Sequence, residues 1–85
     1  MAVNKRDEAI LRFLAEKDIA LPPRPLYENL RLEGATFSYR TVSRRLNHLH
    51  ELGLVEKVLQ EKGYYQITQE GHDYLESGEL ETNQT

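Results

Sequence analysis

GATFSYRTVSRRLNHLHELG, residues 34–53, has the pattern of a turn followed by an amphipathic helix. Ser38 is a suitable N-cap, and Gly53 is a suitable helix end. Between them, apolar residues recur at steps of four, three and three, which places them on one face of a helix: Val42, Leu46, Leu49 and Leu52. The sequence therefore predicts a helix over residues 38–52 with one side packed on a core.

The charge distribution of this stretch differs from that of the rest of the chain. From Gly34 to His50 it contains three arginines and no acidic residue, a local charge of +3. The whole chain has 11 basic and 14 acidic residues and a net charge of −3, so the remainder carries −6. Solubility alone does not explain a positive stripe on an acidic body, whereas a helix that lies against phosphates requires one.

Length and composition restrict the class of protein. With 85 residues, 39% of them hydrophobic, the chain is long enough for one small domain with a modest core. It has no cysteine, which excludes disulfides and cysteine zinc sites and fits a reducing compartment. No stretch has the apolar length of a signal peptide or a membrane span, so we expect a cytoplasmic protein without a membrane partner.

Local patterns predict the remaining elements. The expected helices cover residues 5–16, 25–32 and 69–76, a short strand covers 19–21, and a β-hairpin is formed by 54–59 and 64–68. Asn4 is a plausible N-cap of the first helix, where Asp7 and Glu8 are favourable helix-start charges. Pro25 suits the first turn of the second helix, and Gly34 suits its end.

This order of elements predicts an α+β winged helix-turn-helix fold. Three helices form the core, with a short first strand, a β-hairpin as the wing and a short C-terminal helix. The domain is expected to occupy residues 1–76. Residues 77–85 are polar and acidic and are predicted to form a frayed tail.

In a helix-turn-helix, the N-terminal residues of the second helix contact base edges in the major groove. The residues expected to contact DNA lie along the 38–52 helix, with one more at the wing tip: Ser38, Tyr39, Arg40, Ser43, Arg44, Arg45, Asn47 and Lys62. Arginine presents two donors to guanine, and asparagine forms a matching pair of hydrogen bonds with adenine. Ser38 and the free backbone N–H groups of the first turn suit a phosphate.

Some of these residues have alternative explanations. Arg45 lies at the edge of the core stripe, so packing of its stem or pairing with an acid competes equally with a phosphate contact. Asn47 is as consistent with a plain surface residue as with a base contact. Tyr39 either meets a base or packs on the second helix. His48 and His50 diverge by about 200° on a helix, which is not metal-ligand spacing, so no metal site is expected.

Several segments carry a resemblance to known regulators. TVSRRLNHLHELGLVEKV (residues 41–58) resembles the recognition helix and first wing strand of MarR- and Lrp-like proteins. GYYQIT (63–68) resembles a second wing strand, and TQEGHDYL (68–75) resembles a closing helix. IALPPRPLYENLRLEGATFSYRTV (19–42) is similar to small haloarchaeal winged-helix proteins of the phage-repressor-like kind. The resemblance implies an archaeal host and base contacts at positions matching Tyr39, Arg40, Ser43 and Arg44.

Together these observations predict a sequence-specific regulator of transcription, acting as a repressor on double-stranded DNA. The 38–52 helix is expected in the major groove and the 54–68 wing on flanking backbone or minor groove. A protein-interaction module that does not bind DNA is the alternative, because fold alone does not settle function. No residue pattern suggests an enzyme, a cofactor or a small-molecule ligand. A homodimer is expected from the symmetry of palindromic operators, with a monomer as the alternative.

Overall fold

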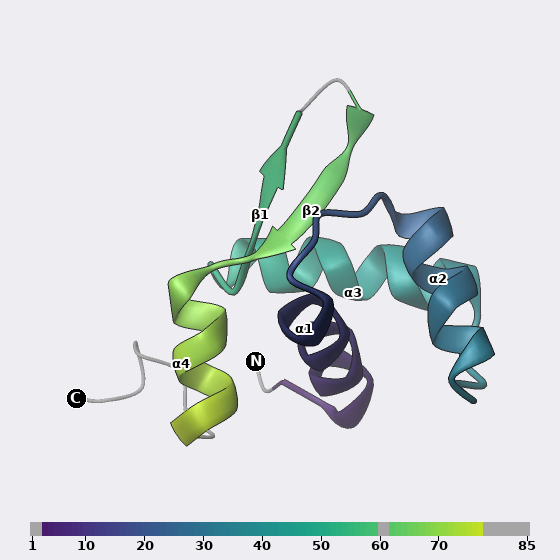
Figure 1. Ribbon diagram of the computed structural model, residues 1–85, viewed down its shortest axis with the longest axis horizontal. Coiled ribbons are helices and arrows are strands. Elements are labelled where there is room, and N and C mark those ends of the chain that lie inside the picture. Colours follow the sequence, from purple (N-terminus) through teal and green to yellow (C-terminus); the bar gives the residue numbers. More distant parts are fainter. Residues whose placement is uncertain (1–2, 60–61, 78–85) are drawn as a thin grey trace.

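The computed structural model describes residues 3–59 and 62–77 and has six elements of secondary structure (Figure 1). In chain order they are α1 (Lys5–Lys17), α2 (Pro23–Leu32), α3 (Tyr39–Glu51), β1 (Val55–Val58), β2 (Tyr64–Ile67) and α4 (Gln69–Ser77). The three-helix core, the antiparallel hairpin and the closing helix confirm the predicted α+β winged-helix fold. Ser77, predicted as the first residue of the tail, is the last residue of α4, and residues 78–85 lie outside the described part.

The predicted helix ends are close to the observed ones. Asn4 caps α1 through a reciprocal pair of hydrogen bonds with Asp7, the arrangement known as a capping box. The start of α2 was predicted two residues late, because Pro23 rather than Pro25 occupies its first position. Gly34 and Gly53 follow α2 and α3 with φ of 102° and 81°, which other residues rarely adopt.

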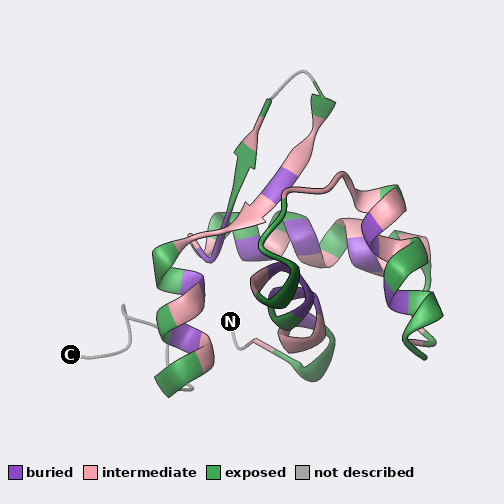
Figure 2. Ribbon diagram, viewed as in Figure 1, coloured by how far each residue is buried: buried purple, intermediate pink, exposed green. Residues whose placement is uncertain are grey.

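Buried side chains from all four helices and both strands meet in one core. Figure 2 shows the buried positions along the facing sides of α1 and α3. The core comprises Ile10, Leu11, Phe13, Leu14, Leu26, Leu30, Val42, Leu46, Leu49, Leu54, Val55, Tyr65 and Tyr74. The predicted apolar stripe of the third helix is confirmed at three of its positions, and the fourth, Leu52, is half-buried against the same core. This packing leaves the opposite side of α3 to solvent.

The strand predicted over residues 19–21 is reduced to a single bridge. Leu21 exchanges two backbone hydrogen bonds of 2.9 Å with Tyr65, whereas Ile19 is exposed. Pro22 and Pro23 follow at once, and α2 begins there, so the pairing cannot extend. The bridge nevertheless ties the segment before α2 to the wing.

The hairpin projects from the helices as a wing (Figure 1). β1 and β2 pair antiparallel with Val55 opposite Ile67 and Val58 opposite Tyr64. Tyr65 is buried and Ile67 packs against the core, so these two residues share the inner face of β2. Residues 60–61 at the tip are outside the described part of the chain.

Thr68 and Gly71 fix α4 against the base of the wing. The Thr68 hydroxyl donates to the Gly53 carbonyl at 2.7 Å and accepts from the Gly71 N–H at 3.0 Å, so it caps α4. A Cβ at Gly71 would collide with the carbonyl oxygen of Leu54. Glycine is therefore required for this close approach. None of the helices described here combines the length and the apolar character needed to cross a bilayer.

Tyr74 anchors α4 to α1 and makes the free energy of unfolding depend on pH in the alkaline range. Its hydroxyl donates to Glu8 Oε2 at 3.3 Å, and burial, followed by the charge of Glu8, raises the pKa of Tyr74. Above pH about 10 the unfolded tyrosine loses its proton while the folded one keeps it, so the free energy of unfolding should fall as pH rises. Urea unfolding at pH 8 and pH 11 checks this. The fall should be smaller in Tyr74→Phe, and an equal fall in both proteins would contradict the assignment to Tyr74.

Candidate nucleic-acid interface

The first turn of α3 is open and free of acidic residues. Ser38 caps it, because its Oγ accepts from the Thr41 N–H at 3.1 Å. Ser38 is exposed, and the partial positive charge of the helix dipole adds to that of Arg40 at the second helical position. The predicted cap is confirmed, and this end of α3 suits an anionic group.

The outward side of α3 forms a ridge, which we define as Arg40, Ser43, Arg44 and Asn47. Both arginines and Asn47 are exposed, and Ser43 is half-buried. Within residues 3–59 and 62–77 the ion pairs are Lys17–Glu33 and Arg45–Asp7. Neither includes Arg40 or Arg44, so both guanidinium groups carry their charge to solvent without a carboxylate partner.

Arg45 is paired with Asp7 and not directed to solvent for DNA, which corrects its predicted DNA contact. Its Nε and Nη2 each donate to Asp7 at 2.6 Å, and the Asp7 side chain is completely buried. The hydrogen bond to Asp7 raises the pKa of Arg45, although partial burial opposes it. Of the three explanations that the sequence left open, pairing with an acid holds. Asp7 is thus more than a helix-start charge, since it joins α1 to α3.

Tyr39 packs on the second helix, so that alternative of the prediction holds. Its ring meets Tyr27 edge-on, with 5.9 Å between centroids and 73° between planes. The guanidinium of Arg24 lies 4.1 Å from the centroid of the Tyr39 ring. Arg24 is exposed at the start of α2 and was not among the predicted site residues. In the sequence, the position of Arg24 between two prolines was the only local pattern that distinguished it.

The wing continues the ridge. Tyr65 donates its hydroxyl to Asn47 Oδ1 at 3.3 Å, a long hydrogen bond that orients the amide. Lys57 Nζ lies 5.7 Å from the Tyr65 ring centroid, and the ring of His50 meets Tyr65 edge-on at 6.3 Å. Lys57 and Lys62 are both exposed. Through Tyr65, these contacts connect Lys57 of the wing to Asn47 on the ridge.

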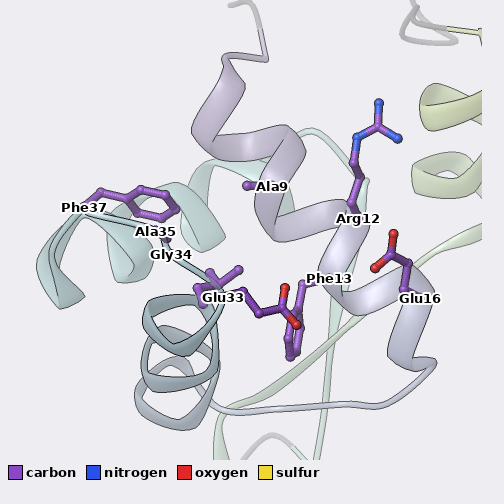
Figure 3. Close-up of a pocket in the computed structure, with 9 residues that line it drawn as sticks. Ala9, Arg12, Phe13, Glu16, Glu33, Gly34, Ala35 and Phe37 are labelled. Atoms are coloured by element: carbon purple, nitrogen blue, oxygen red, sulfur yellow. The ribbon is translucent and has the colours of Figure 1, made fainter.

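A hollow lies away from this surface. It is an open groove of about 430 Å³ between α1 and the turn from α2 to α3 (Figure 3). Its lining residues are Ala9, Arg12, Phe13, Glu16, Leu30, Glu33, Gly34, Ala35 and Phe37. None of them belongs to the ridge or the wing, so the groove is separate from the candidate interface. Across the described parts of the chain, no three histidine or acidic side chains gather as metal ligands would.

Comparison with known proteins identifies one family. The model of the ribonuclease R winged-helix domain matches residues 8–75, which cover α1 to α4 almost completely. Neither the curated proteins nor the solved structures contain a match. The family supports the winged-helix fold and, with it, a nucleic-acid-binding type of domain. It leaves the MarR- and Lrp-like specificity and the archaeal origin as expectations.

Proposed function

The chain belongs to the ribonuclease R winged-helix domain family, and on this premise we propose that it is a sequence-specific double-stranded DNA-binding regulator of transcription. One observation carries the proposal: Arg40 and Arg44 stand exposed on α3 without a carboxylate partner among residues 3–59 and 62–77. An uncompensated pair of arginines one helical turn apart on an acidic protein is suited to phosphates and guanine edges.

The geometry favours double-stranded DNA over double-stranded RNA. The major groove of B-DNA is about 12 Å wide and admits an α-helix, whereas the major groove of A-form RNA is too deep and narrow for side chains to read. A protruding helix with a wing beside it fits the major groove of B-DNA and does not fit that of A-form RNA. We propose that α3 enters the major groove while the wing meets the flanking backbone. Occupying an operator in this way would repress transcription.

Selection from random double-stranded DNA, followed by fluorescence polarisation, tests the proposal. Enriched sequences should bind with an affinity that falls with salt at a slope near −0.9 per phosphate contacted. Single-stranded and double-stranded RNA of the same sequence should bind more weakly. Absence of enrichment at low salt, or a preference for RNA, would reject the DNA-binding regulator. Palindromic selected sites would indicate a homodimer, and single half-sites a monomer.

Lys62 provides a further check on the wing. It is exposed on the wing and has no partner for its ammonium group among the described residues. Lys62→Ala should weaken binding to operator and to unrelated duplexes by the same factor and reduce the salt slope by about 1. Polarisation titrations at four salt concentrations would measure both. A sequence-dependent loss would instead assign Lys62 to base recognition.

The rival function is a protein-interaction module. The net charge of −3 and the exposed Leu32, which keeps 84% of its surface, favour it. One exposed leucine is common on monomers, however, and the arginine ridge has no explanation under this alternative. Reversing the charges of Arg40 and Arg44 separates the two functions, since a module that binds through α2 would keep its partner.

A further inference from the structure

A stack of cations and aromatic rings joins the start of α2 to the start of α3. Arg24 lies over the ring of Tyr39, which meets Tyr27 edge-on, and Arg31 lies 5.7 Å from the Tyr27 centroid. The Arg24–Tyr39 contact is the shortest cation–ring distance in the described residues, at 4.1 Å. A guanidinium stacked at this distance is attracted by the ring and keeps its N–H edge available for an oxygen acceptor.

The backbone that carries Arg24 is restrained on both sides. Pro22 is the N-cap of α2, Pro23 is its first residue, and Pro25 follows Arg24. Each proline ring fixes φ at about −65°, so the backbone can vary little at this point. The first turn of α2 contains no acidic residue, and no ion pair within residues 3–59 and 62–77 involves Arg24. The charge is therefore held in place and is not neutralised.

Arg24 also lies beside the start of α3, the part of the helix proposed to contact bases. Tyr39, under its guanidinium, is the first residue of α3 and directly precedes Arg40. The first turn of α2, which carries Arg24, is the end of that helix nearer the wing (Figure 1), and the contact with Tyr39 brings Arg24 to the start of α3. DNA that meets α3 and the wing would pass the start of α2.

We propose that Arg24 is a phosphate-binding residue, held by the Tyr39 ring, that anchors the DNA backbone beside the point where α3 enters the groove. The inference rests on the proposed function and assigns to Tyr39 a positioning role in place of the expected base contact. Preorganisation reduces the side-chain entropy lost when Arg24 binds a phosphate, which is the benefit of stacking it on Tyr39 before DNA arrives.

Four variants, titrated against the selected operator and an unrelated duplex, test this inference. Arg24→Gln should weaken both complexes by about tenfold, as expected for the loss of a charge-assisted hydrogen bond, and should reduce the salt slope by about 0.9. Tyr39→Leu should give part of this loss, and Tyr39→Phe almost none. Arg12→Gln, which removes the same charge from an exposed position on α1 outside the ridge and the wing, should leave the slope unchanged.

The double variant Arg24→Gln/Tyr39→Leu should bind no more weakly than Arg24→Gln alone, because Tyr39 acts through Arg24. Circular dichroism melts check that each variant is folded. An unchanged salt slope in Arg24→Gln, with DNA binding otherwise intact, would overturn this inference and leave the proposed function standing. Failure of the unmodified protein to bind any duplex would overturn both.

Discussion

Replacing Asp7 with alanine is expected to lower the free energy of unfolding by about 3 kcal/mol, a large part of the 5–15 kcal/mol roughly typical of a domain. Asp7 is completely buried and accepts three hydrogen bonds: two from Arg45 at 2.6 Å and one from the Asn4 N–H at 3.0 Å. Its removal leaves a guanidinium without a counter-charge between α1 and α3. Arg45 keeps 24% of its side-chain surface, so partial hydration places the loss at the lower end of the range of about 3–5 kcal/mol for broken buried pairs.

Urea unfolding measures this loss, and the exposed pair supplies a matched control. Lys17 and Glu33 are 3.8 Å apart with about half of each side chain in solvent, so Glu33→Ala should cost less than about 1 kcal/mol. The double variant Asp7→Leu/Arg45→Met replaces both charges with apolar groups and should recover much of the stability lost in Asp7→Ala. Equal effects of Asp7→Ala and Glu33→Ala would show that the buried pair contributes no more than a surface one.

Local sequence was sufficient for the fold because each element has its own caps and periodicity. Asn4 and Ser38 are N-caps that local sequence predicts, and Gly34 and Gly53 follow helix ends because they adopt positive φ. The start of α2 was ambiguous because three prolines each suit a first helical turn. The strand predicted at 19–21 was too long, because β propensity does not show how many of its residues pair with another strand.

The site was less predictable because its contacts join distant parts of the chain. Asp7 and Arg45 are 38 residues apart, and no periodicity links them. The helical angle identified Arg45 as ambiguous but did not supply its partner. Tyr39 and Arg24 meet only because α2 and α3 cross at their starts, a result of tertiary packing. In contrast, the exposure of Arg40 and Arg44 follows directly from their position opposite the core stripe, and the structure agrees.

The double variant Arg40→Glu/Arg44→Glu is expected to lose specific DNA binding altogether. Each arginine that is bidentate to a guanine contributes about 1–3 kcal/mol of discrimination, and a glutamate at the same place adds repulsion from phosphates. Alanine variants separate these effects, since Arg40→Ala and Arg44→Ala should each lose about 1–3 kcal/mol of preference for operator over a mismatched duplex. Polarisation titrations against both duplexes give the preference directly.

A control with the same change in net charge is available on α1. Arg12 and Lys17 are exposed there, away from the ridge, so Arg12→Glu/Lys17→Glu should retain the preference for operator while weakening all binding slightly. Salt concentration gives a second way to distinguish contacts with bases from contacts with phosphates. At about 1 M the Debye length is about 3 Å, which screens phosphate attraction but not hydrogen bonds to bases. A preference that survives high salt and disappears in Arg40→Ala and Arg44→Ala would mean that these residues read bases. Equal losses on operator and mismatch would mean that they touch only phosphates, and the specificity would then have to come from elsewhere on the ridge.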